Sequence, residues 1–213
     1  MEKKIVIFID LEGTLTSENE LEFKEKDMEK FLEQLSLLEK KGNAKVAINL
    51  VSPIPVNSMV RIKNKLNKYI NDYNKKYKKD LKKVESAACS IDDEYEYTDS
   101  AIVPLPNSYN GSSKNFFVTS WHKLLKERYN ISNCIYIGNG LNDHDAMLYI
   151  RNQAKGIVLC PANSHYSVKD VANYIGESNE LLGVTQAMDK YINERYLDDR
   201  INLEWWWHKI TWR

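Results

Sequence analysis

A short apolar run, Ile5 to Ile9, leads directly into the acidic turn Asp10-Leu11-Glu12-Gly13. A continuous run of this kind, rich in β-branched residues, is typical of a strand that is covered on both faces of a parallel sheet. Gly13 then allows the chain to turn sharply just past the strand. Because open α/β sheets bind their ligands at the carboxyl ends of the strands, we expect Asp10 to stand at a functional edge.

Helical and strand-like patterns alternate along the chain. Residues 25–41 carry apolar side chains at three- and four-residue spacings and stop at Gly42, which predicts a helix, and Lys45 to Ser52 is typical of a second buried strand. The two strands of such a strand–helix–strand unit are expected to be parallel, so Ser52 should stand beside Asp10. The same reasoning predicts further strands over 116–119, 134–138 and 156–160, and further helices over 120–129, 142–149, 167–173 and 181–192. This alternation predicts a parallel sheet with helices on both faces.

The middle of the chain departs from this alternation. Pro53 and Pro55 interrupt it, and a lysine-dense helical stretch over 57–83 is followed by an acidic stretch over 85–99 and a cluster of turn-forming residues. We therefore predict a core formed by residues 1–56 and 112–213, with 57–111 as a small inserted cap. The lysine-dense helix is interpreted either as a solvated face or as a surface that holds an anionic substrate.

Composition narrows the class of protein further. The 213 residues suit one domain with a modest insertion, and 30 Lys and Arg balance 30 Asp and Glu, which gives no overall reason to expect nucleic acid or an anionic membrane as partner. The three cysteines lack a CxxC spacing and are interpreted as reduced core residues, hence a cytoplasmic protein. No run approaches the ~20 apolar residues of a membrane span. The tail, residues 203–213, contains four tryptophans, which predicts packing back on the domain or a homodimer contact.

A second acidic turn, Gly138-Asn139-Gly140-Leu141-Asn142-Asp143, follows the predicted strand that ends at Ile137. Small residues followed by polar ones at the start of a helix allow close backbone approach and direct polar groups out of the sheet edge. Candidate functional residues thus follow separate predicted strands and should converge on one crevice: Asp10, Glu12, Ser52, Asn139 and Asp143.

These residues carry a resemblance to a known family. Asp10-Leu11-Glu12-Gly13-Thr14-Leu15-Thr16 resembles the DxDGTLT first motif of the haloacid dehalogenase (HAD) superfamily, Ser52 resembles its second motif, and Gly138 to Asp143 resembles the GDGxND fourth motif. Segments between 156 and 184, beginning with Gly156-Ile157-Val158-Leu159-Cys160-Pro161-Ala162-Asn163, are similar to the Cof-type (IIB-like) sugar-phosphate phosphatases. The resemblance implies a HAD-like, Rossmannoid α/β core.

The resemblance also implies an activity and its residues. By this similarity Asp10 would attack phosphorus to form an aspartyl-phosphate, and Glu12 would act as acid and then as base in a magnesium-dependent phosphatase of small phosphorylated metabolites. The implied phosphate-binding residues are Gly13, Thr14, Ser52 and Asn142, and the implied Mg²⁺ ligands are Asp10, Glu12, Asn139 and Asp143. The lysine of the third motif has two candidates, Lys123 and Lys114, of which we favour Lys123.

Two departures from the family pattern weaken this expectation. Glu12 is one methylene longer than the usual aspartate, and Asn139 places a neutral amide where the family usually has a charged ligand. We expect weaker Mg²⁺ binding and reduced activity, since a displacement of roughly 1 Å in a catalytic group can cost on the order of 100-fold in rate. The alternative is a catalytically impaired HAD-fold protein that binds a phosphorylated ligand or a protein partner.

Overall fold

The computed structural model of the protein describes residues 1–17, 21–90, 100–105 and 112–210, with side chains to residue 196. Its strands are β1 Lys3–Ile9, β2 Lys45–Pro55, β3 Ser86–Ser90, β4 Ile102–Pro104, β5 Asn130–Ile137, β6 Ile157–Cys160 and β7 Tyr174–Ile175. Its α-helices are α1 Glu25–Gly42, α2 Val56–Tyr77, α3 Ser112–Arg128, α4 His144–Asn152, α5 Tyr166–Val171 and α6 Glu180–Ile210, and a 3-10 turn, η1, covers Leu141–Asp143. The strands form one sheet in the order β4-β3-β2-β1-β5-β6-β7, and every neighbouring pair is parallel. The predicted α/β fold class with a parallel sheet is confirmed.

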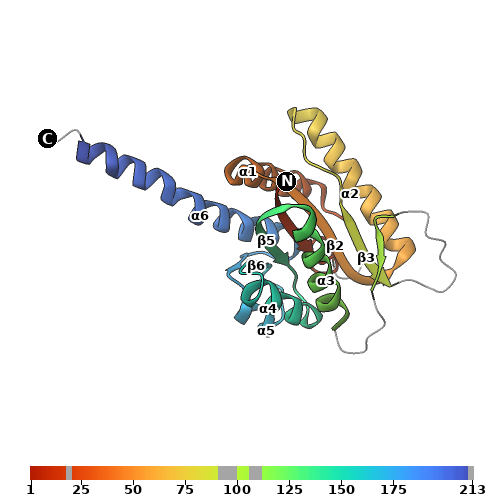
Figure 1. The fold of residues 1–213 in the computed structure, drawn as a ribbon. Helices are drawn as coiled ribbons and strands as arrows, with labels where there is room; N and C mark the ends of the chain where they lie inside the picture. The colour runs from red at the N-terminus through yellow and green to blue at the C-terminus, as the bar shows by residue number, and fades with distance from the viewer. Residues whose placement is uncertain (18–20, 91–99, 106–111, 211–213) are drawn as a thin grey trace.

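Helices cover both faces of this sheet, with α1, α2 and α6 on one side and α3, α4 and α5 on the other (Figure 1). The central strand β1 shows why its sequence is apolar throughout. Ile5, Ile7 and Ile9 enter the first core, whereas Val6 and Phe8 enter the second, because successive side chains of a strand point to opposite faces. The three cysteines are buried and free, as predicted for core residues.

Residues 56–90, the first part of the predicted cap insertion over 57–111, belong to the main sheet layers, and the division of the chain into core and cap stays a prediction. β3 pairs with β2, and α2 packs on the same core as α1. The apolar side of α2 follows helical spacing: Val56, Met59, Ile62, Leu66, Ile70 and Tyr73 are buried. β4 extends the sheet from β3, while residues 91–99 and 106–111 lie outside the described chain. The strand β2 also continues through Pro53 and ends at Pro55, so these prolines do not interrupt it.

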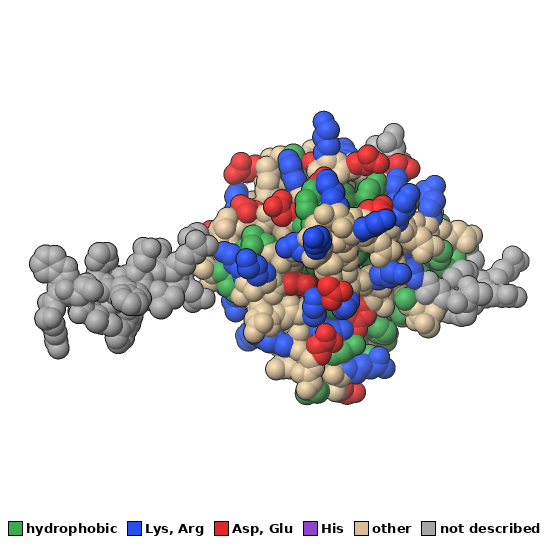
Figure 2. Space-filling view, turned by 90° about the horizontal axis from the view of Figure 1, so that it is seen from above, with side chains coloured by type: hydrophobic (Ala, Val, Ile, Leu, Met, Phe, Trp, Pro, Cys, Tyr) green, Lys and Arg blue, Asp and Glu red, His purple; other side chains and the backbone are tan. Residues whose placement is uncertain are grey.

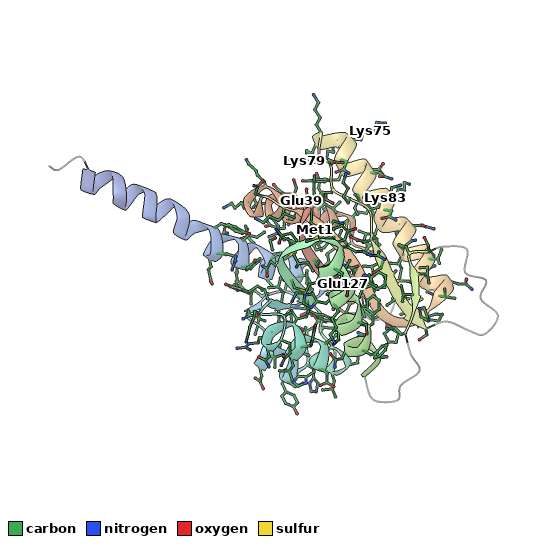
Figure 3. All side chains as sticks on the ribbon, viewed as in Figure 1. Met1, Glu39, Lys75, Lys79, Lys83 and Glu127 are labelled. Carbon is green, nitrogen blue, oxygen red and sulfur yellow. The ribbon has the colours of Figure 1, made fainter. Side chains whose placement is uncertain are left out.

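The lysine-dense segment lies away from the carboxyl edge of the sheet. α2 follows β2 at that edge and runs back for 22 residues, about 33 Å of helix. Just past its end, Asp80 lies 3.4 Å from Lys45 at the beginning of β2. Figure 3 shows Lys75 and Lys79 at this far end, and Figure 2 shows Lys and Arg side chains mixed with Asp and Glu on the face seen from above. This placement favours the solvated-face interpretation over contact with a substrate at Asp10.

Two predictions in the second half of the chain need correction. Residues 116–119 were predicted as a strand, but they lie within α3, where Phe117 stacks on Trp121 one helical turn later with ring centroids 5.5 Å apart. The last predicted helix, 181–192, continues as α6 to Ile210, and Figure 1 shows its carboxyl-terminal part extending away from the sheet layers. The tryptophan side chains of the tail lie outside the described residues, so their role stays a prediction. Within the described chain, no helix combines the length and the apolar character that crossing a membrane requires.

Candidate active site

Three charged side chains meet in the interior at the carboxyl edge of the sheet. The Nζ atom of Lys114 lies 2.8 Å from Oδ1 of Asp10 and 2.7 Å from Oδ1 of Asp143. Asp143 is completely buried, and Lys114 and Asp10 are 1% and 4% exposed. The structure thus brings together two predicted site carboxylates and one of the two candidate lysines.

Separate elements place these side chains. Asp10 directly follows β1, and its backbone N–H donates to the carbonyl of Ile137 at the end of β5, which ties the first acidic turn to the second. Asp143 ends η1, just after β5, and Lys114 projects from the first turn of α3. The cluster therefore depends on the pairing of β1 with β5 and on the packing of α3 beside η1.

The carboxylate of Asp143 is held by four donors. Lys114 Nζ and the hydroxyl of Tyr136 both donate to Oδ1, each over 2.7 Å. The backbone N–H groups of Asn139 and Gly140 donate to Oδ2 over 3.1 and 2.9 Å. A carboxylate offers about four acceptor positions, so this one is fully used by the protein.

The charges of the cluster influence one another strongly. Burial, followed by the neighbouring Asp143 carboxylate, raises the pKa of Asp10 to about 7, although Lys114 opposes this shift. Burial would lower the pKa of Lys114, but the charges of Asp10 and Asp143 outweigh it, and the pKa is raised. Burial and the same two carboxylates raise the pKa of Tyr136 well above its usual value, so its hydroxyl stays a donor.

The structure places Lys114 at the two carboxylates, and not Lys123, which the sequence analysis favoured. Lys123 is exposed on α3, nine residues after Lys114, which corresponds to about 13 Å along the helix and to its opposite side. Lys114 instead contacts both carboxylates. The sequence did not separate the two candidates, because the beginning of α3 among the turn-forming residues near 112 was not predicted.

The predicted phosphate-binding residues have different surroundings. Ser52 is completely buried next to the end of β1, and its hydroxyl has no hydrogen-bond partner among the described residues. The backbone N–H of Thr14 donates to the carbonyl of Leu11 and its hydroxyl donates to Oδ1 of Asn139, so both donors already have partners, and a role of Thr14 in phosphate binding stays a prediction. Gly13 adopts a φ of 70°, which favours glycine. Asn142 is exposed, and its Oδ1 lies 3.4 Å from Lys114 Nζ.

Two residues that were not predicted as site residues support the loops of the site. Asn163 donates from Nδ2 to the carbonyl of Gly13 and accepts at Oδ1 from the backbone N–H of Glu180, so it joins the first acidic turn to the start of α6. Tyr136 was predicted only as part of a buried strand. The signal in the sequence was a tyrosine within a buried strand, because a buried tyrosine hydroxyl usually has a hydrogen-bond partner.

The site offers oxygen atoms of the kind that a hard cation prefers as ligands, but too few acidic side chains of the described chain are grouped there to hold one. Among the described residues, no three His, Cys, Asp or Glu side chains are grouped closely enough to hold a metal ion. Asp143 would have to release a donor to bind one. The remaining oxygens are the Asp10 carboxylate, the half-buried Glu12, and Oδ1 of Asn139, which also accepts from the Thr14 hydroxyl over 3.1 Å. Such oxygens suit Mg²⁺ and similar ions.

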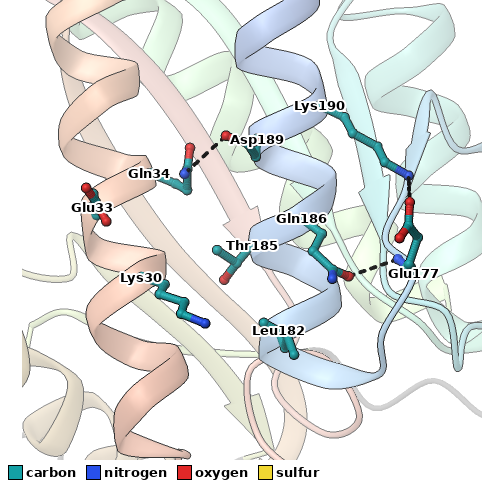
Figure 4. A pocket seen from close by; sticks show the side chains of 9 residues that line it. All are labelled: Lys30, Glu33, Gln34, Glu177, Leu182, Thr185, Gln186, Asp189 and Lys190. Atoms are coloured by element: carbon teal, nitrogen blue, oxygen red, sulfur yellow. Dashed lines mark hydrogen bonds and ion pairs between the residues drawn. The ribbon is translucent and has the colours of Figure 1, made fainter.

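A hollow of about 530 Å³ lies elsewhere, between α1 and α6 (Figure 4). Its lining carries both signs of charge, and several of its polar groups are paired with one another. Gln34 donates to Asp189 over 3.4 Å, and Lys190 lies 3.1 Å from Glu177. The carboxylates and the lysine described above do not line it, so it is not part of the candidate site.

Comparisons with known proteins identify the fold. The sequence matches no protein-family model and no curated protein. Among solved structures, the cobalt-bound deoxy-D-mannose-octulosonate 8-phosphate phosphatase of Haemophilus influenzae is 14% identical, with 89% of this chain and 86% of that chain covered at a TM-score of 0.50. A haloacid dehalogenase-like hydrolase of Bacillus subtilis, yhjK, is 16% identical, with 88% of each chain covered at 0.50. A Legionella pneumophila protein assigned to HAD subfamily IIIA is 12% identical, with 93% and 87% covered at 0.51. The chain therefore has the fold of the HAD superfamily.

Proposed function

We propose that this protein is a phosphatase that hydrolyses a small phosphorylated metabolite through an aspartyl-phosphate on Asp10, with a divalent cation such as Mg²⁺. The observation that carries the proposal is the buried contact of Lys114 with both Asp10 and Asp143 at the carboxyl edge of the sheet. This edge is where sheets of this kind bind ligands. The fold shared with a sugar-phosphate phosphatase adds support.

Asp10 is the proposed nucleophile. One of its carboxylate oxygens forms a bond to phosphorus while the bond from phosphorus to the leaving oxygen breaks, and Glu12 gives the leaving oxygen a proton. Glu12 then takes a proton from water, whose oxygen attacks phosphorus, and the acyl phosphate bond breaks to release inorganic phosphate and restore Asp10. Lys114 keeps a positive charge beside Asp10 throughout. This charge offsets the repulsion between the Asp10 carboxylate and an approaching anionic phosphoryl group.

Ser52 is the proposed donor to the phosphoryl group. Its hydroxyl is buried and unpartnered among the described residues, beside the end of β1 that carries Asp10. A buried hydroxyl without a partner is costly, so a ligand oxygen that accepts from it would stabilise the complex. Gly13 and Asn142 are proposed to border the same position.

The proposed cation ligands are oxygens of Asp10, Glu12 and Asn139. A bound cation would neutralise charge where carboxylate and phosphate meet. Because Asn139 is neutral and Asp143 is engaged by four donors, we expect weak affinity for the cation alone. The Cof-type branch, the homodimer contact through the tail and the cytoplasmic location stay predictions.

A panel of phosphorylated metabolites, assayed for phosphate release with and without Mg²⁺, tests this function. We expect release from at least one substrate that depends on the cation and disappears in Asp10→Asn. Lys123→Met is the matched surface variant and should keep full activity. Release that survives in Asp10→Asn would contradict the nucleophile.

A second candidate is a protein that binds a phosphorylated ligand with little turnover. The neutral Asn139 and the fully engaged Asp143 favour it, because both lower the number of charged groups that can hold a cation. In this case the panel would show no release, while orthovanadate or phosphate would still raise the melting temperature. That rise should be lost in Ser52→Ala.

A further inference from the structure

Tyr136 on β5 places a hydroxyl in an otherwise apolar core. The side chain is completely buried, and its ring belongs to the core between the sheet and helices α3 to α5. Its hydroxyl donates to Oδ1 of Asp143 over 2.7 Å. This oxygen is the same one that accepts from Lys114 over 2.7 Å.

The shared oxygen couples Tyr136 to the lysine. Lys114 lies between Asp143 and Asp10, at 2.7 and 2.8 Å from one oxygen of each, so its position reflects a balance between the two carboxylates. Donation from Tyr136 satisfies part of the charge on Asp143 Oδ1 and weakens the attraction of this oxygen for Lys114. The other oxygen of Asp143 is fixed by the backbone N–H groups of Asn139 and Gly140, so the carboxylate cannot turn away.

We propose that Tyr136 is a positioning residue: by sharing Oδ1 of Asp143 with Lys114, it weakens the pull of this oxygen on the lysine and thereby holds Lys114 against the Asp10 carboxylate. Asp143 is then an anchor for the lysine and for the 138–143 loop rather than a ligand of a cation. The effect of Tyr136 on catalysis rests on the proposed function, whereas its coupling to Lys114 does not. Tyr136 contacts neither substrate nor cation; it acts through Asp143.

Tyr136→Phe tests the coupling, and Tyr149→Phe is its matched control. Each variant loses one hydroxyl, but that of Tyr149 lies 3.0 Å from Nδ1 of His122 and not at the carboxylates. The first readout is the NMR signal of the buried Lys114 ammonium, assigned by its loss in Lys114→Met or, if that variant does not fold, in Lys114→Arg. We expect Tyr136→Phe to shift this signal and Tyr149→Phe to leave it unchanged. An unshifted signal in Tyr136→Phe overturns the proposal, whatever the effect on stability.

The second readout is kinetic. Tyr136→Phe should lower kcat by about tenfold with KM within twofold of the wild type, because a misplaced Lys114 affects the reaction more than binding, and Tyr149→Phe should change neither by more than twofold. A change in KM alone overturns the proposed route through Lys114. If the wild-type protein releases no phosphate at all, the proposed function fails, and the Lys114 signal still decides whether Tyr136 positions the lysine.

Discussion

Lys114 at the start of α3 and Asp10 at the end of β1 meet in the interior, with 2.8 Å between the ammonium nitrogen and a carboxylate oxygen. Neither side chain has more than a few per cent of its surface exposed. Buried charges are tolerated when they are paired, and here a single cation serves two carboxylates. The contact therefore matters for stability as well as for chemistry.

Lys114→Met should destabilise the protein strongly. The change leaves Asp10 and Asp143 buried without their cation, and loss of one partner of a buried ion pair costs about 3–5 kcal/mol. Urea unfolding would measure the change in the free energy of unfolding. Lys123→Met on the exposed side of α3 is the matched control and should stay within about 0.5 kcal/mol of the wild type. Equal stability of the two variants would contradict the buried cluster.

Gly138→Ala should displace Asp143. A Cβ atom at this position would lie 2.6 Å from both Cγ and Oδ2 of Asp143, and these atoms are fixed by four donors. We expect a loss of about 1–3 kcal/mol in unfolding free energy, as for other overpacked interiors, together with a lower rate of phosphate release.

Gly140→Ala provides the comparison for this glycine. Its Cβ atom would also meet an oxygen at 2.6 Å, but this oxygen is the end of the exposed Asn142 side chain, which can move. We expect a change within about 0.5 kcal/mol. If Gly140→Ala cost as much as Gly138→Ala, the fixed position of Asp143 would not be the reason.

The convergence of the two acidic turns was predictable from the sequence, because it follows from a general rule. Parallel strands end at one edge, so residues that directly follow apolar runs, such as Asp10 and Asn139, lie along that edge, and the pairing of β1 with β5 makes these two neighbours. The apolar stripe of α2 is equally visible in the sequence at Met59, Ile62 and Leu66, but the lysines around it are typical of a solvated helix outside the core. The sequence of β3, Ser86–Ser90, consists of small residues with weak strand preference, so its place in the sheet was not visible locally.

The choice between Lys114 and Lys123, by contrast, could not be made from the local sequence pattern. Both occur in polar surroundings, and only the beginning of α3 and its packing beside η1 distinguish them. The role of Tyr136 likewise depends on a contact between β5 and the following loop that periodicity does not report. Tertiary contacts therefore decided the details of the site, whereas local pattern decided its location.

His122 should titrate far below the usual range of histidine. Burial, followed by the charge of Lys126, lowers the pKa of His122 to about 4. The unfolded chain then binds more protons than the folded one between about pH 6.5 and pH 4, so stability is present above pH 6.5 and is lost as the pH falls toward 4. NMR titration of the ring protons should give the low value directly, and His122→Gln should reduce the loss of stability in this range. A ring signal that titrates near 6.5 would contradict the prediction.

Glu12→Asp combined with Asn139→Asp should tighten the binding of a divalent cation. The first change shortens a carboxylate by one methylene, and the second adds a charge where the Thr14 hydroxyl can still donate, since it now donates to the Asn139 amide oxygen over 3.1 Å. We expect the dissociation constant for Mn²⁺, measured by calorimetry, to fall by at least about tenfold, which is 1.4 kcal/mol. Glu127→Asp on the exposed end of α3 is the control for a shortened side chain and should leave the constant unchanged. If the double variant binds Mn²⁺ no more tightly than the wild type, neither residue faces the cation, and the proposed ligand set fails.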